Sequence, residues 1–319
     1  MCGHKLSCFI NLLNKTGLVY ALFHFLGEWL IYRLLYTAEE KGNPFMYCIT
    51  KILNNNALLA TEKGKSDERI LLGKGIGFGK RTGDFIEERE GIQVYTPVGS
   101  EKRSSAMQVV NTIDPVYIEA AGRIIEEAEK VFDSIKGDIL LPLADHIAFA
   151  AHRAQNDTFF ANPLIQDIKI LFGKEYAVAL ECRRTVEELT GYQISDDEAG
   201  FIALHIHSGL SGEQVSDTLR MTQIIDESIQ IVGECVGYRL KKASHSYIRL
   251  MSHLYYMVIR SRTGEAVNVE LNDFMKQKYP KAMQIAQIVC GKMESRLNQP
   301  LASDEQGFLA VHIQRLIAL

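Results

Sequence analysis

Short apolar runs alternate with clusters of turn-forming residues from Met46 to about Val98. Runs of this length, bounded by Gly, Asn and Asp, are typical of β-strands joined by tight turns. We therefore expect a small all-β unit in this part of the chain. Its predicted strands are Ile49–Leu53, Ala57–Ala60, Ile70–Gly73, Gly77–Lys80 and Ile92–Thr96.

Beyond residue 107 the spacing of apolar residues becomes helical. Ile118, Ile125 and Phe132 follow one another at seven-residue steps and so fall on one stripe of a helix. The pattern predicts helices over Ile113–Phe132 and Met221–Tyr238. Further helices are expected between the breaking residues Pro142, Gly173, Gly191 and Pro280.

The helical part is duplicated at an offset of 107 residues. His146 and His205 recur as His253 and His312, and Arg153 recurs as Arg260. The identities around the second histidine are Asp197, Glu198, Gly200, Phe201, Ala203, His205 and Ile206, which recur as Asp304, Glu305, Gly307, Phe308, Ala310, His312 and Ile313. Such self-similarity indicates repeated structural units. We expect two homologous all-α helical-bundle domains, at residues 107–213 and 214–319.

The first 45 residues differ from the rest. The apolar stretch Leu18–Tyr36 is interrupted by His24, Glu28 and Arg33, whereas a membrane-spanning helix needs about 20 residues with few or no charges. It also lacks the small-residue cleavage site of a secretory signal. We interpret residues 1–45 as a mis-started or disordered extension, with translation from Met46. The predicted fold is thus multidomain, with a small all-β domain at 46–103 followed by the two helical domains.

Charge and cysteine content narrow the class of protein. The chain has 319 residues, of which 47% are hydrophobic, and a formal net charge of −4. This net negative charge argues against binding of a polyanion by the whole surface. Its six cysteines show no CxxC spacing, so we expect no zinc module and a reducing, cytoplasmic location.

One local exception to the acidic charge lies in the β unit. Between Lys51 and Arg81, seven basic residues face three acidic ones, a local net charge of +4. Asn54–Asn56 offers amide groups to bases or 2′-hydroxyls, and Phe78 offers a stacking surface, so an RNA face is indicated. Asparagine runs are also common turns, and a lone Phe is commonly core. A dinucleotide-binding site would need a helix directly after the glycines of 73–80, and none is predicted there. These glycines could equally allow two backbones to approach in a tight hairpin, which is compatible with an RNA face.

The repeated histidines are the second candidate site. His146 and Arg153 are seven residues apart and share a helix face, which suits a phosphate on the imidazole, and His253 with Arg260 repeats this arrangement. Taken alone, His205 and His312 would be interpreted as hydrogen-bonded core histidines. The fourfold recurrence instead favours a role in phosphate handling. A phosphorylated imidazole would add roughly two negative charges by analogy with other phospho-residues. His152 and His207 have no counterparts and are expected to be structural or exposed.

The ordered motifs resemble those of BglG-type transcriptional antiterminators, and particularly the glucose-type members. Thr50–Ala60 and Gly73–Lys80 are similar to the co-antiterminator RNA-binding domain of that family. Leu143–Ala150 and Gly200–Ser208 resemble the histidine motifs of its first PTS regulation domain. The resemblance covers Met46 to Leu319.

This resemblance implies a homodimer that binds a leader mRNA hairpin and stabilises it against an overlapping terminator. The histidines would accept phosphate from the phosphocarrier protein or the sugar-specific permease of the phosphotransferase system. No enzyme activity, cofactor, metal, DNA binding or membrane insertion is expected. The implied RNA contacts are Lys51, Asn54, Asn56, Lys74, Gly75, Phe78 and Lys80; the phosphorylation sites are His146, His205, His253 and His312, supported by Arg153 and Arg260.

Two departures from the family pattern bear on these sites. Lys74 stands where many relatives carry Arg, and Lys makes no planar bidentate contact. Ser252 precedes His253 where Asp145 precedes His146, so a carboxylate that would orient the imidazole is missing from the second module.

Two other functions remain open at this point. A metal-dependent phosphohydrolase would use His205 and His207 with Asp197 or Glu198, but histidines two apart on a helix point in different directions. A DNA-binding activator with the same regulation domains would need a helix-turn-helix, and strand punctuation precedes Asn111 instead.

Overall fold

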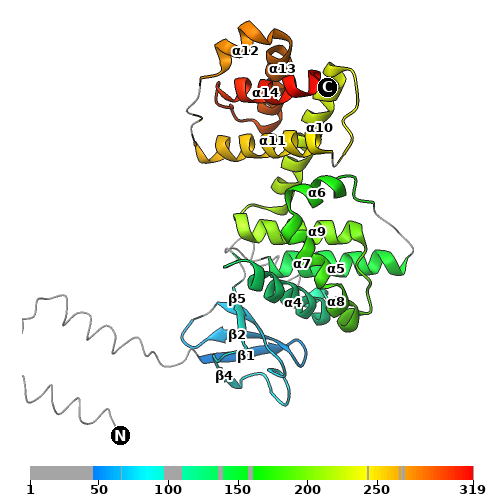
Figure 1. The fold of residues 1–319 in the computed structure, drawn as a ribbon. Coiled ribbons are helices and arrows are strands. Elements are labelled where there is room, and N and C mark those ends of the chain that lie inside the picture. The colour runs from blue at the N-terminus through cyan, green and yellow to red at the C-terminus, as the bar shows by residue number, and fades with distance from the viewer. Residues whose placement is uncertain are drawn as a thin grey trace, which may run out of the picture.

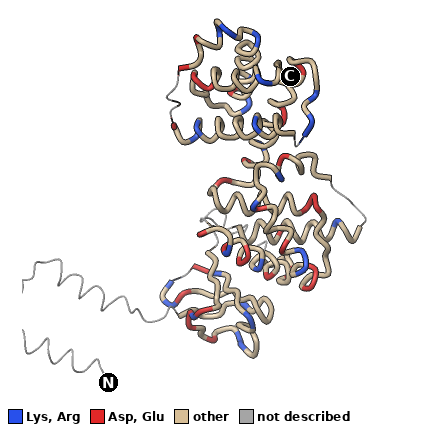
Figure 2. The backbone as a smooth tube through the Cα atoms, in the orientation of Figure 1, with Lys and Arg blue, Asp and Glu red and all other residues tan. Residues whose placement is uncertain are grey.

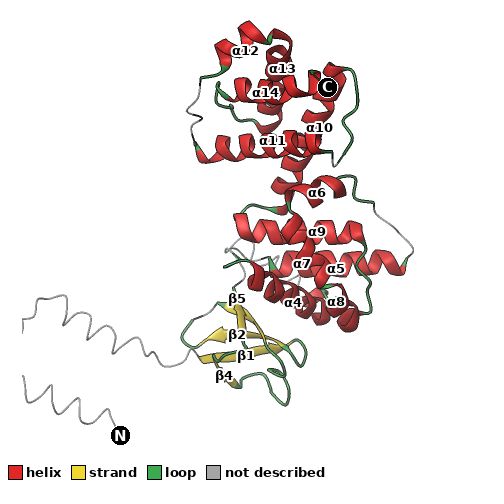
Figure 3. Cartoon of the chain, viewed as in Figure 1, coloured by secondary structure: helices red, strands yellow, loops and turns green. Residues whose placement is uncertain are grey.

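The computed structural model describes residues 46–318, apart from 66, 97–109, 136–138, 157–160, 243, 266 and 268–269. The extension 1–45 and the proposed boundaries at 103 and 107 lie outside the described residues. Strands occupy the N-terminal part, and helices occupy the remainder (Figures 1 and 3).

The strands form one antiparallel sheet in the order β4-β1-β2-β3-β5. They are β1 (Met46–Ile52), β2 (Ala57–Glu62), β3 (Glu68–Leu72), β4 (Phe85–Glu87) and β5 (Gln93–Tyr95). Residues Ala57–Ala60 of β2 are all apolar because both faces of this strand are covered. Leu58 and Ala60 pack in the small core of the β unit, whereas Ala57 and Leu59 join the core of the helical part.

The expected strand Gly77–Lys80 is wrong, because residues 74–79 form turns. Gly75 and Gly79 both have φ +69°, a left-handed conformation that a strand does not contain. A Cβ on Gly77 would lie 2.3 Å from the carbonyl oxygen of Asn54, so only glycine allows the two loops to approach. The other four predicted strands are present, and β4 was not expected.

The helices of the first helical region are α4 (Pro115–Val131), α5 (Leu140–Gln155), α6 (Ile165–Leu171), α7 (Gly173–Glu181), α8 (Arg183–Thr190) and α9 (Asp196–Ser211). Those of the second are α10 (Val215–Val236), α11 (His245–Thr263), α12 (Asn272–Lys278), α13 (Pro280–Leu297) and α14 (Glu305–Ile317). α4 and α10 confirm the two predicted helices. The starts of α6 and α12, and of α7 and α13, are each separated by the 107-residue offset of the sequence repeat.

Local sequence explains where the site-bearing helices begin and end. Ser195 caps α9 by accepting from the backbone N–H of Glu198, and Gly212 ends it with φ +75°. Ser244 and Gly264 perform the same roles for α11. These caps fix the register of the helices that carry His205 and His253.

The described helices contain no stretch long and apolar enough to cross a bilayer. Lys and Arg are interspersed with Asp and Glu along the helical regions rather than gathered in one element (Figure 2). The apolar stretch Leu18–Tyr36 lies outside the described residues.

Candidate functional sites: paired histidines and a strand-loop face

The first pair of histidines comes together from two helices. His146 on α5 and His205 on α9 have ring centroids 5.2 Å apart, and Phe201 lies 5.6 Å from His146 on the other helix. His205 is buried, with 8% of its surface exposed, whereas His146 is only partly buried. Two residues 59 positions apart in sequence therefore share one site.

Glu198 lies between the first pair and Arg153. Its Oε2 is 2.9 Å from Nε2 of His146, although these atoms lack hydrogen-bond alignment, and its Oε1 accepts a 2.7 Å hydrogen bond from Nη2 of Arg153. Asp145, the carboxylate suggested by the sequence, is exposed on α5. The recurrence of Glu198 as Glu305 was the signal that could have identified this carboxylate.

The second pair has a related but different geometry. The rings of His253 on α11 and His312 on α14 stack with centroids 4.5 Å apart. Glu305 binds Arg260 through both oxygens, with Nε at 2.6 Å and Nη2 at 2.9 Å. Nε2 of His253 has no hydrogen-bond partner among the described residues. The second carboxylate is thus committed to the arginine, whereas Glu198 also approaches a histidine.

Burial keeps three of these imidazoles neutral. Burial is the main reason that the pKa of His205 falls to about 3, and the nearby His146 adds to this effect. Burial, and then His312 and Arg260, lower the pKa of His253 to about 3, while burial and two arginines also lower the pKa of His312. A neutral imidazole retains the nitrogen lone pair that a phosphoryl group requires, so the electrostatics suit a nucleophile at neutral pH.

An exposed aromatic residue follows the leading histidine of each pair by one helical turn. Phe149 is 58% exposed and Tyr256 is 57% exposed, and they occupy equivalent positions of the repeat. The guanidinium carbon of Arg153 lies 4.7 Å from the Phe149 ring centroid. Sequence reasoning missed this duplicated feature.

The two additional histidines have other surroundings. Nδ1 of His207 lies 2.9 Å from Oε1 of Glu175, and its ring centroid is 4.2 Å from that of Phe172. His152 is exposed on α5. His205 and His207 therefore contact different neighbours, and the described residues contain no cluster of three or more His, Cys, Asp or Glu arranged to hold a metal ion.

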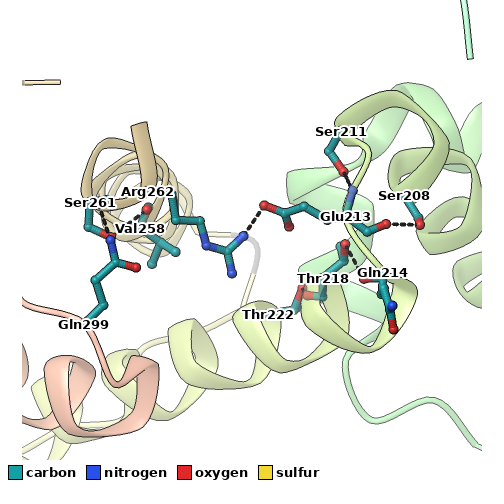
Figure 4. A network of polar contacts seen from close by, with 10 residues as sticks. All are labelled: Ser208, Ser211, Glu213, Gln214, Thr218, Thr222, Val258, Ser261, Arg262 and Gln299. Carbon is teal, nitrogen blue, oxygen red and sulfur yellow. Dashed lines mark hydrogen bonds and ion pairs between the residues drawn. The ribbon is translucent and has the colours of Figure 1, made fainter. Parts of the chain in front are cut away.

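Polar contacts connect α11 to the first helical region. Arg262 at the end of α11 pairs with Glu213 in the loop after α9, and Ser208 donates to the Glu213 carbonyl (Figure 4). At the other end of α11, the hydroxyl of Tyr247 donates to the fully buried carboxylate of Asp167. The helix that carries His253 is thus fixed at both ends to the region that carries His205.

The candidate RNA residues lie on two adjoining loops of the β unit. The amide N–H of Gly75 donates to Oδ1 of Asn56 at 2.7 Å, and the N–H of Gly77 donates to the Asn55 carbonyl at 2.9 Å. Lys51, Lys74 and Lys80 are exposed, and Phe78 is 77% exposed. Asn54 and Asn56 are partly buried. The structure thus brings six of the seven residues onto these loops, with Lys51 on the neighbouring strand β1.

Two family models match successive parts of the chain. The family model for the CAT RNA binding domain matches residues 47–103, and that for the PRD domain matches 122–209 and 226–316. The chain is 29% identical over 272 residues to the beta-glucoside operon antiterminator of Dickeya chrysanthemi, covering 84% of this chain and 96% of that one. It is 30% identical over 274 residues to the GlcA/glcB genes antiterminator of Staphylococcus carnosus, covering 84% and 94%.

A third relative is the transcription antiterminator LicT of Bacillus subtilis, which is 29% identical over 274 residues, covering 84% of this chain and 98% of LicT. Among solved structures, a crystal structure of GlcT CAT-PRDI is 32% identical, covers 52% of this chain and 99% of that chain, and gives a TM-score of 0.46.

Proposed function

Since this chain belongs to the BglG-type family of transcriptional antiterminators, with a CAT RNA-binding domain followed by PRD regions, we propose which of its residues bind RNA and which accept phosphate. The protein is an RNA-binding antiterminator of the kind controlled by the sugar phosphotransferase system, and its family consists of regulators rather than enzymes. The metal-dependent phosphohydrolase has no support.

The RNA face consists of Lys51, Asn54, Asn56, Lys74, Gly75, Phe78 and Lys80. The observation that supports it is the exposed ring of Phe78 on a loop that Asn56 holds in place through Gly75. An aromatic ring in solvent provides a platform for an unpaired base, and the lysines supply charge for the phosphates. The Asn amides provide donors and acceptors for base edges or 2′-hydroxyls.

The phosphoacceptors are His146, His205, His253 and His312. One observation carries this assignment: each histidine pair lies in contact, and each has a glutamate–arginine pair at the same offset. Arg153 and Arg260 supply cations for the new phosphate. The donors are the phosphocarrier protein and a sugar-specific permease of the phosphotransferase system.

The remaining assignments follow from this function. The working chain is a cytoplasmic homodimer that binds a leader mRNA hairpin. Its RNA-binding domain spans 46–103, and two homologous helical-bundle regulation domains span 107–213 and 214–319. Residues 1–45 are an extension that RNA binding does not need.

A gel shift with the leader hairpin RNA upstream of the neighbouring sugar-transport genes tests the RNA face. Phe78→Ala should weaken binding of the full chain by about 1–3 kcal/mol, the usual contribution of one stacked base. Phe85→Ala is the control, because Phe85 is a second exposed aromatic residue on strand β4. Equal loss in both variants, or loss in neither, would remove the RNA face from the Phe78 loop.

A further inference from the structure

Glu119 of α4 accepts hydrogen bonds from both asparagines of the proposed RNA face. Nδ2 of Asn56 donates to its Oε1 at 2.8 Å, and Nδ2 of Asn54 donates to its Oε2 at 3.3 Å. The Glu119 side chain belongs to the first helical region, and only 8% of the residue surface is exposed. Each oxygen of one carboxylate therefore accepts from one of the two amides.

The contact extends beyond this carboxylate. Nζ of Lys51 donates to Oδ1 of Asn111, just before α4, at 2.7 Å. A Cβ on Gly122 would lie 2.4 Å from Cδ1 of Leu72, so α4 approaches β3 closely at a glycine. Three of the seven proposed RNA residues thus bind the helical region, whereas Phe78, Lys74 and Lys80 remain exposed.

The chemistry of this contact resembles that expected for RNA. An asparagine Nδ2 donates to base carbonyls, 2′-hydroxyls or phosphate oxygens, and the Glu119 carboxylate presents the same kind of acceptor with a negative charge. RNA cannot use the N–H that Glu119 holds on each of the two amides. Its phosphates would also be repelled by the carboxylate.

We propose that Glu119 is an intramolecular competitor of the RNA, which holds half of the RNA face against α4 until RNA binding or a domain rearrangement displaces it. This inference rests on the proposed RNA contacts of Asn54 and Asn56. The exposed half of the face, around Phe78, serves the first encounter. Full binding then requires Asn54 and Asn56 to leave Glu119.

The position of α4 connects this contact to the histidines. α4 packs along α5, the helix that carries His146, and the same Gly122 position that faces Leu72 also lies close to Leu140 of α5. α4 therefore lies between the RNA face and a proposed phosphorylation site. A shift of α5 on phosphorylation would change the contact at Glu119 without any direct contact between phosphate and RNA.

The test is the affinity of the full chain for the leader hairpin RNA in Glu119→Ala and Glu119→Gln. If Glu119 reduces the competent fraction, its removal should tighten binding by about threefold or more, and Gln, which keeps one acceptor, should give a smaller gain. Glu127→Gln is the matched control. It makes the same charge change on the same helix about 12 Å further along, at a residue paired with Lys130.

Hydrogen–deuterium exchange over residues 53–57 of the RNA-free chain gives a second readout. Glu119→Ala and Glu119→Gln should raise exchange there, and Glu127→Gln should not. Unchanged affinity in both Glu119 variants, while Phe78→Ala weakens binding as expected, would overturn the competitor and leave the proposed function intact. Absence of RNA binding by the wild-type chain and by every variant would overturn both.

Discussion

Oε2 of Glu198 lies 2.9 Å from Nε2 of His146, so a carboxylate of α9 stands beside an imidazole of α5. The other oxygen of Glu198 binds Arg153. In the second region Glu305 uses both oxygens on Arg260. A phosphate on His146 would therefore compete with Glu198 for Arg153, whereas one on His253 would have to open a bidentate pair. The two regions are thus expected to respond differently to phosphorylation.

Glu198→Gln should destabilise the fold, because it removes the charge from the hydrogen bond between Glu198 and the partly buried Arg153. We expect a loss of about 1–3 kcal/mol in the free energy of unfolding, the usual cost of breaking a charged hydrogen bond. Urea denaturation measures it. Glu188→Gln, which breaks an exposed pair with Arg184 on α8, should change the unfolding free energy by no more than about 0.5 kcal/mol. Similar effects of the two substitutions would contradict the role of Glu198.

Stability should fall as the pH drops below about 6.5. The pKa of His205 and of His253 is about 3 in the folded chain, against 6.5 for an ordinary histidine. Between these values the unfolded chain binds protons that the folded chain does not, so acid favours unfolding. Each imidazole contributes a slope of up to about 1.4 kcal/mol per pH unit, and its contribution is constant above pH 7.

The check is urea denaturation at several values between pH 5 and pH 7.5. The double variant His205→Gln with His253→Gln should show a clearly shallower slope than the wild-type chain. His152→Gln, which changes an exposed histidine of α5, should retain the wild-type slope. A double variant with the full wild-type slope would show that other groups take up the protons.

Gly77→Ala should disrupt the RNA face by sterics alone. Its Cβ would lie 2.3 Å from the Asn54 carbonyl oxygen, so the two loops must separate. At Gly75 the Cβ would meet nothing within 4 Å, so Gly75→Ala should cost folding only the strain of φ +69°, about 1–2 kcal/mol. Thermal unfolding compares the two. A smaller loss of stability in Gly77→Ala than in Gly75→Ala would contradict this packing.

Changes at the first histidine pair should alter antitermination without any direct contact between that pair and the RNA. His146→Asp or His205→Asp places a negative charge in this largely buried site. Each should shift the expression of a leader–reporter fusion strongly in one direction. Ala at the same position should make the reporter independent of sugar supply. Reporter activity that still follows sugar supply in His146→Ala with His205→Ala would show that the first pair does not carry the signal.

Much of the architecture could be predicted from local pattern. β-branched and apolar runs predicted four of the strands, and the 107-residue repeat singled out the four histidines. That they come together as two pairs is a finding of the structure. The strand at Gly77–Lys80 was wrong, because alternating glycines satisfy a strand pattern while permitting the left-handed backbone of a turn. β4 has three residues, too few for periodicity to reveal.

The partners of the candidate residues could not be predicted in the same way. Asp145 precedes His146 in sequence, but adjacent residues on a helix point in different directions, and Glu198 reaches the imidazole from another helix. The contact of Asn54 and Asn56 with Glu119 depends on how the sheet meets α4. No local pattern in either segment encodes that arrangement.

In the proposed function, four histidines carry phosphate from the sugar phosphotransferase system. Its most direct test incubates the full chain with labelled phosphoenolpyruvate, the general phosphotransferase proteins and a permease domain, and compares it with a variant in which His146, His205, His253 and His312 are all Ala. The wild-type chain should take up acid-labile label, and the variant should take up none. Undiminished label in the variant would contradict the assignment and point to His207 or His152.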